Sequence, residues 1–481
     1  MMDKTFHDFF YGKDIEKGAG LKGAIDLKTA YLIIKYFNSD INKEIGHIEV
    51  KNQNISIKTG VSCQLSNIHF GVTNYSHEKV KISFEPTNLI HIKINGLEAW
   101  GHITSFFQVL LVHYTENISF EINKLNIHAI VMIKSKSVGD KLLPDAVAIS
   151  LDYDYDFDFG LTSSFGKFVI LFKNAIKKLI REEINKLIEK KLNLGIQIGL
   201  SMIPNEIVID KNKGYIIDYS LVTPPYIENN FILFNSYARF INKNIPETQN
   251  KDNYFLPYGI PSYDLIGKSS QLYVSEYVIN TALFTFFKSR ELEILITPDM
   301  LPPNLPLIKL NTSWLNMIFK DISNVFGMDI PVYIRVIVNE NPQLIFKDEM
   351  ISFILPSNIE IIVEGFQGIA VKFKTTFFVD VVFKVFENCK ISGNIKSCNI
   401  QNTQIISSYA DDEEFGSKVE KQFNILKGLA LPFVNTLVLK NIMHFDLPVI
   451  KGIKFTDLTI SHHENFVIIN YNFQYNEFER L

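Results

Sequence analysis

The sequence has too few cysteines for a disulfide-based fold. Only three occur among 481 residues, whereas a disulfide scaffold needs several pairs. Cys389 and Cys398 flank the segment KISGNIKS, which we interpret as a hairpin that turns near Gly393. These two thiols either form a candidate disulfide across the hairpin or remain free. Cys63 stands alone.

Long apolar runs and an excess of charge are also missing. A helix that spans a bilayer needs roughly 20 predominantly apolar residues. The best candidate, residues 428–439, is shorter and contains Pro432. Residues 1–20 lack the apolar core of a signal peptide. The formal net charge is −4, so we expect no basic surface for nucleic acid.

Motifs of the common enzyme classes are absent. The sequence contains no G-x-S-x-G, H-E-x-x-H, phosphate-binding loop or dinucleotide-binding glycine pattern. We therefore expect no catalytic residues, no enzymatic activity and no cofactor.

Two groups of possible metal ligands do not predict a metal site. The run DYDYDFD at 152–158 places its four aspartates on one strand face and its aromatic residues on the other. A calcium-binding loop would need glycine at position six and glutamate at position twelve, and both are missing. We interpret this face as solvated, with a loose cation site as the alternative. His462 and His463 are adjacent, so on a strand they would point to opposite faces.

Apolar and aromatic residues, by contrast, are abundant and follow two periods. Hydrophobic residues make up 47% of the chain, and 39 Phe and 20 Tyr must be buried or line a cavity. Most of the chain alternates with period two, typical of half-buried antiparallel strands. Four stretches have helical spacing instead. The clearest alternating runs are 91–96, 118–134, 147–159 and 359–386, and the helical stretches are 27–45, 165–188, 271–290 and 416–442.

The order of these elements is duplicated. Helix, strands and helix come before a proline-marked connection, and the same order follows it. The length of the chain also favours two domains, so we divide it into 1–222, 223–270 and 271–481. A long helix along a twisted sheet either fills the interior or leaves room for a ligand. Periodicity does not decide between these interiors.

Five segments, in order along residues 20–470, resemble one protein family. They are residues 20–45, YSLVTPP at 219–225, YVSEY with NTA at 273–282, DMLP at 299–302, and FDLP with HENF at 445–466. The family is that of bactericidal/permeability-increasing protein, lipopolysaccharide-binding protein and cholesteryl ester transfer protein, which share a tubular lipid-binding fold. The resemblance implies an α+β boomerang: two tandem elongated barrels, each a highly twisted antiparallel sheet with long helices, joined by a central sheet. It also implies that acyl chains lie between helix and sheet in each half.

Two departures from the family narrow the expected function. The disulfide that usually ties the second helix to the strand before it has no cysteines here, so packing must hold the two together. The hairpin region 95–123 contains no Lys or Arg, unlike the basic tip of the antibacterial members. Its Trp100, Phe106 and Phe107 are candidates for a membrane tip that inserts shallowly. A buried hairpin is the alternative.

We therefore expect a monomeric lipid-binding or lipid-transfer protein that holds phospholipid, or another two-chain lipid, in both halves and contacts membranes transiently. The alternatives are a host-defence-type binder of lipopolysaccharide or another anionic glycolipid, and a structural or adhesion protein with filled barrels. Secretion is favoured because the chain begins close to the family's mature start, and a cytoplasmic location is the alternative. Asn-x-Ser/Thr sequons, mostly expected by chance in so Asn-rich a chain, allow glycosylation. The candidate lipid-binding residues, taken from the helical faces, are Ile34, Phe37, Phe168, Phe172, Ile176, Leu179, Val278, Phe284, Phe423, Leu426 and Leu429.

Overall fold

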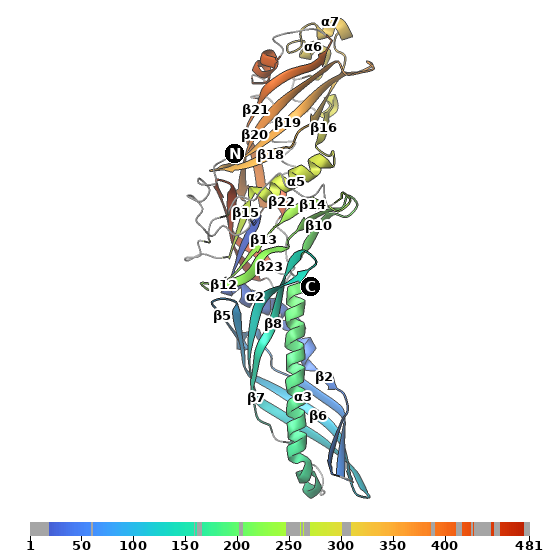
Figure 1. Cartoon of the computed structure of the whole chain (residues 1–481), viewed down its shortest axis with the longest axis vertical. Helices are drawn as coiled ribbons and strands as arrows, with labels where there is room; N and C mark the ends of the chain where they lie inside the picture. The colour runs from blue at the N-terminus through green and yellow to red at the C-terminus, as the bar shows by residue number, and fades with distance from the viewer. Residues whose placement is uncertain are drawn as a thin grey trace.

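The computed structural model is an elongated molecule built mainly from antiparallel strands, with a few helices (Figure 1). This confirms the α+β class. The structure describes residues 19–58, 61–157, 159–160, 166–201, 205–246, 260, 263, 270–300, 309–385, 390–409, 416–424, 427, 444–446 and 453–475. Among the helices in these segments, none is both long enough and apolar enough to span a bilayer.

One 14-stranded sheet runs through the lower and middle parts of the molecule (Figure 1). Its lower part follows the order β2-β4-β6-β7-β8, with β3 and β5 paired at the side and β9 on β7. The long alternating runs of the sequence form these strands, because every second side chain faces the interior. Their bounds are β2 Ile48–Val50, β3 Gln53–Lys58, β4 Val61–Val72, β5 Val80–Glu85, β6 Leu89–Val109, β7 Val112–Val138, β8 Lys141–Asp154 and β9 Phe159–Gly160, with a short 3-10 helix η1 at His77–Lys79.

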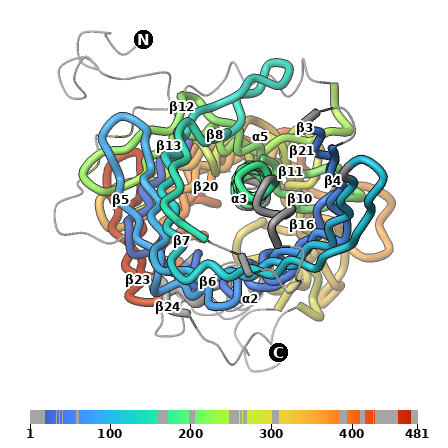
Figure 2. Tube along the Cα trace, turned by 90° about the horizontal axis from the view of Figure 1, so that it is seen from below, coloured from blue at the N-terminus to red at the C-terminus, as the bar shows by residue number. Residues whose placement is uncertain are grey.

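Two helices accompany this part of the sheet. Helix α2 (Leu27–Gly46) begins at Asp26, whose side chain accepts a hydrogen bond from the Thr29 amide at 2.9 Å and caps the helix. Helix α3 (Gly166–Ser201) is longer than the predicted stripe of 165–188. Seen along the molecule, α3 lies inside the curve of the sheet (Figure 2).

The middle of the sheet combines distant parts of the chain. Its order is β12-β13-β1-β15-β24-β23, so the first strand lies between strands from the connection and from the second half. Because all three predicted segments contribute strands here, the division into 1–222, 223–270 and 271–481 remains a prediction. The strands are β1 Leu21–Asp26, β12 Leu221–Glu228, β13 Phe231–Ser236, β15 Ser270–Ser275, β23 Ile453–His463 and β24 Phe466–Tyr475.

The upper part of the molecule has its own seven-stranded sheet, ordered β16-β17-β19-β20-β21-β22 with β18 beside β19. A small sheet, β10-β11-β14, lies near helix α5. The bounds are β10 Glu206–Asp210, β11 Tyr215–Asp218, β14 Arg239–Asn242, α5 Glu276–Lys288, β16 Glu293–Ile296, η2 Pro298–Met300, α6 Thr312–Leu315, α7 Ile322–Phe326, β17 Val332–Val338, β18 Gln343–Lys347, β19 Met350–Val363, β20 Val371–Val385, β21 Lys390–Ser408 and β22 His444–Asp446.

Two predictions of local structure need correction. Residues 390–408 form the single strand β21, so the predicted hairpin near Gly393 does not exist. Cys398 lies within this strand as a free thiol, and burial raises its pKa to about 11; Cys389 is outside the described residues. The helix predicted over 271–290 begins only at Glu276, after strand β15. Of the predicted 416–442 helix, 416–424 and 427 are described, and these are helical.

Candidate functional site

A narrow cavity lies between α3 and the concave face of the large sheet. Its volume is about 20 Å³, which is room for about one water molecule. Its lining is almost entirely apolar and consists of Val50, Ile68, His69, Phe70, Ile103, Phe120, Leu179, Ile180, Glu183 and Ile184. The neighbouring interior is filled, since the rings of Phe107 and Phe172 meet edge to face with centroids 5.2 Å apart. In this closed state the interior is a packed core with a small defect.

An open groove lies next to this cavity, where β7 approaches the segment that follows β8. Its volume is about 760 Å³, and its lining mixes polar and apolar side chains. Phe120 lines both the groove and the cavity. Its ring lies 4.9 Å from that of Phe157, centroid to centroid. Phe120 therefore lies between the wide groove and the narrow apolar cavity, and Phe157 packs against it from the side of the groove.

Polar contacts hold α3 against β8 and the segment that follows it. The Tyr153 hydroxyl donates to the Asn185 carbonyl, and the Tyr155 hydroxyl donates to the Asn185 side chain, both at 3.0 Å. Burial raises the pKa of Tyr155 to about 12, so the hydroxyl stays protonated and keeps donating at neutral pH. Lys177 reaches Asp156 at 2.9 Å, and its hydrogen bond lowers the pKa of that carboxyl.

Comparison with known proteins identifies the family of the chain. The family model described as "LBP / BPI / CETP family, C-terminal domain" matches residues 209–475, more than half of the chain. The chain belongs to this family.

Individual relatives are more distant. Lipopolysaccharide-binding protein of Rattus norvegicus is 25% identical over 334 residues, which cover 66% of this chain and 64% of the relative. The match thus spans less than two thirds of that relative's length. The crystal structure of lipopolysaccharide binding protein has a TM-score of 0.48 at 17% identity, covering 95% of this chain and 99% of the other. Takeout 1 of Epiphyas postvittana has a TM-score of 0.26 at 12% identity, covering 37% of this chain and 93% of the other.

The first half of this family member brings several predicted lining residues together. Phe172 and Ile176 are buried on the face of α3 that packs on the sheet, and Leu179 lines the cavity. Ile34 of α2 packs, partly buried, against the same core. The side chains of Phe37 and Phe168 are outside the described part of the structure.

Sequence reasoning missed the opposite wall of this cavity. Val50, Ile68, Phe70, Ile103 and Phe120 come from the sheet, whereas the prediction drew only on helical faces. The period-two alternation of β4 and β6 was the available signal, because it places every second residue on the concave face.

The second half does not bring its predicted residues to one place. On α5, Ile279 and Leu283 pack against the core of Leu344, Phe346, Ile351 and Val467. Val278 and Phe284 are half-buried on the same helix, and the Lys288 ammonium lies 5.2 Å from the Phe284 ring centroid. Phe423 packs elsewhere, beside Phe377. Leu426 and Leu429 are outside the described residues.

The structure corrects one residue of the predicted membrane tip, and the tip itself stays a prediction. Phe107 is fully buried, so it is not available to a membrane. Trp100 lies within β6, and its ring is 5.9 Å from that of His47. Phe106 is exposed, and three further exposed apolar residues lie at the β6–β7 turn. Leu110, Leu111 and Val112 are 69%, 94% and 57% exposed.

The aspartate run behaves as a solvated face. Asp152, Asp154 and Asp156 are exposed, while the alternating Tyr155 and Phe157 are buried. Asp158 is outside the described residues. This arrangement agrees with the interpretation of a strand face in water.

Proposed function

We propose that this protein is a lipid carrier that binds a phospholipid, or another two-chain lipid, between α3 and the large sheet. The observation that carries the proposal is the apolar cavity under α3, which shares Phe120 with an open groove that Phe157 also lines. Acyl chains would enter past these rings, and the headgroup would stay in the groove beside Lys124. Membership of the family supports this assignment.

Binding requires the cavity to open. A volume of about 20 Å³ holds no acyl chain, so α3 must move away from β7 and β8. The polar contacts of Asp156 with α3 are solvent-exposed, and exposed ion pairs contribute little to stability. At roughly 25 cal/mol per Å² of apolar surface, burial of two acyl chains supplies well over 10 kcal/mol before entropic costs. Lipid burial is therefore large enough to drive the opening.

The β6–β7 turn is the part of the molecule that we assign to transient membrane contact. Leu110, Leu111 and Val112 are exposed at its end, and the hairpin region 95–123 carries no Lys or Arg. An uncharged apolar turn favours shallow insertion over attraction to anionic lipid. We extend the proposal to a monomeric protein that acts outside the cytoplasm.

A cavity-filling substitution tests the lipid site. Leu179→Trp places a large ring in the cavity, whereas Lys178→Trp adds the same ring on the exposed neighbouring position of α3. After incubation with phosphatidylcholine vesicles, native mass spectrometry should find lipid on the wild type and on Lys178→Trp, with much less on Leu179→Trp. A wild-type protein that stays free of lipid and transfers none between vesicles would contradict the proposal.

Lipopolysaccharide binding is the second candidate, favoured by the name of the rat relative. Lipopolysaccharide phosphates need charge-assisted contacts, so this function predicts strong binding that weakens steeply with salt. Salt-independent uptake of phosphatidylcholine favours the first function. Salt-sensitive uptake of lipopolysaccharide alone favours the second.

A further inference from the structure

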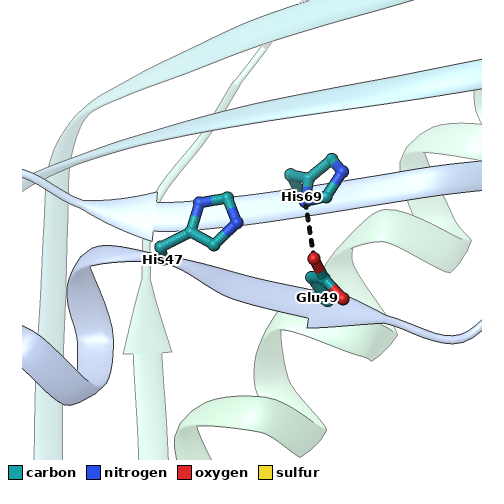
Figure 3. Close-up of side chains that lie close together, drawn as sticks. All are labelled: His47, Glu49 and His69. Carbon is teal, nitrogen blue, oxygen red and sulfur yellow. Dashed lines mark ion pairs between the residues drawn. The ribbon is translucent and has the colours of Figure 1, made fainter.

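Three metal-binding side chains meet at the edge of the large sheet. His47 follows the end of α2, Glu49 lies on β2, and His69 lies on β4. One ligand atom from each residue lies within 4.8 Å of the other two. Figure 3 shows the Glu49 carboxylate directed at His69, with the His47 imidazole beside them. Of the three, His69 also lines the cavity under α3, whereas His47 and Glu49 do not.

The register of the β2–β4 pair brings these side chains together. Glu49 and His69 are direct partners across the antiparallel β2–β4 pair, so their side chains lie on the same face. His47 precedes Glu49 by two residues in extended conformation, which returns it to that face.

A glycine on β4 brings the end of α2 close to these strands. A Cβ atom at Gly71 would lie 2.2 Å from the Gly46 carbonyl oxygen and 2.7 Å from Trp100 Nε1. Only glycine therefore lets the end of the helix approach. The approach leaves the His47 ring stacked on that of His69, with centroids 5.1 Å apart.

His69 provides an independent sign that a ligand belongs here. Its Nδ1 is buried and has no hydrogen-bond partner. The nearest carboxylate oxygen, from Glu49, is 4.0 Å away, which is too far for a hydrogen bond. A buried nitrogen without a partner is unusual in a folded protein and calls for an explanation such as a bound ion.

We infer that His47, Glu49 and His69 form a binding site for a divalent transition-metal ion, with Zn²⁺ as the representative. Two imidazoles and one carboxylate suit zinc and its neighbours, whereas Mg²⁺ and Ca²⁺ prefer oxygen ligands alone. Metal–ligand bonds of 2.0–2.2 Å in a tetrahedron place ligand atoms roughly 3.4 Å apart. Separations of up to 4.8 Å need a closure of up to about 1.4 Å, which the exposed side chains of His47 and Glu49 allow by rotation.

A metal ion at this site would fix the edge strand β2 in place. β2 has three residues and pairs only with β4 among the described strands. A bound ion would tie β2 and the end of α2 to β4. Val50 and Ile68, the neighbours of Glu49 and His69, line the cavity under α3. The ion would thus stabilise one wall of that cavity, whether or not a lipid enters it.

The test is a metal titration of the full chain. Co²⁺ reports tetrahedral ligation by visible absorption, and Zn²⁺ should displace it with one equivalent per chain. His47→Ala, Glu49→Gln and His69→Gln should each weaken Zn²⁺ binding by at least about 10-fold, since even loss of an outer-shell partner costs that much. His113→Ala is the control, because His113 is exposed on β7 outside the site and should leave binding unchanged.

A second measurement separates loss of the site from loss of the fold. Zn²⁺ should raise the melting temperature of the wild type and of His113→Ala but not that of His47→Ala. His47 is exposed, so its substitution should leave the metal-free melting temperature unchanged. The inference is overturned if the wild type binds no stoichiometric Co²⁺ or Zn²⁺, or if the three site variants bind as tightly as the control.

Discussion

The two ends of the molecule cover their sheets in different ways. At the lower end one helix of 36 residues, α3, lies inside a curved sheet. At the upper end the named helices are shorter, with α5, α6 and α7 having 13, 4 and 5 residues, and residues 416–424 add a further helical segment. A single long helix can move as one body and open the space beneath it. Several shorter helices each cover only a part of a sheet.

The cores of the two ends differ accordingly. The lower core is one large cluster that spans β4, β6, β7 and α3, with the cavity inside it. The upper end has two separate clusters, one around Val332 and Phe373 and one around Leu344 and Phe346. The lipid site that we propose lies in the lower half.

The largest expected effect is on core stability. Phe172→Ala and Phe346→Ala each remove a fully buried ring, so each should lower the free energy of unfolding by roughly 3–5 kcal/mol. Urea unfolding followed by circular dichroism measures this. Only Phe172→Ala should also change lipid binding, because Phe172 lies beside the cavity. Equal loss of lipid in both variants would mean that the halves do not differ in function.

The next effect lies at the junction of the halves. Glu276 begins α5, and its carboxylate accepts a hydrogen bond from the Phe346 amide at 3.1 Å. Burial raises the pKa of Glu276 to about 7. The folded state thus holds this proton more tightly than the unfolded state, and the resulting stability is present below pH 4.5 and lost as the pH rises through 7.

Glu276→Gln removes this titration and keeps an acceptor for the amide. Between pH 4.5 and 8 the free energy of unfolding of the wild type should fall by up to about 3 kcal/mol relative to that of the variant. Urea titrations at both pH values measure the difference. A constant gap between wild type and variant would show that Glu276 is not titrating in this range.

The sequence predicted the elements of the fold better than their interior. Period-two runs became β6, β7, β8, β19 and β20 because one face of each strand must be buried. Gly365 and Gly368 lie in the turn that separates β19 from β20. The hairpin at Gly393 failed because pairing with β20 continues through that glycine: Phe383 lies opposite Gly393 in one unbroken strand. A glycine marks a turn only when no neighbouring strand pairs with it.

The sequence predicted the residues of the candidate sites less completely than it predicted the strands and helices. The α3 stripe was predictable because its buried residues recur every four positions. The wall made by β4 and β6 required knowing which strands face α3. The meeting of His47, Glu49 and His69 depends on the β2–β4 register, and register between strands is not encoded in a local pattern. Adjacent histidines attracted attention in the sequence, while the pair that meets in space is separated by 22 positions.

A smaller effect concerns the exposed apolar residues at the two ends. Leu111 is 94% exposed at the β6–β7 turn, and Met328 is 74% exposed after α7 at the opposite end. Leu111→Ser should weaken binding to neutral phosphatidylcholine vesicles by at least about 10-fold, since one inserted apolar side chain contributes roughly 1.5–3 kcal/mol. Vesicle co-sedimentation measures this. Met328→Ser should have no effect, and equal loss in both would remove the assignment of the β6–β7 turn as the membrane contact.

The smallest effect tests whether α3 is the moving part. Tyr155→Phe deletes the hydroxyl that bonds to Asn185 of α3, and Tyr409→Phe deletes one that bonds to the Lys320 carbonyl in the upper half. Each should cost about 1 kcal/mol of stability. Hydrogen exchange should then quicken along α3 only in Tyr155→Phe, and lipid uptake should quicken with it because opening is the step that this contact opposes. If Tyr409→Phe accelerates uptake to the same extent, general loss of stability explains the change and α3 is not the gate.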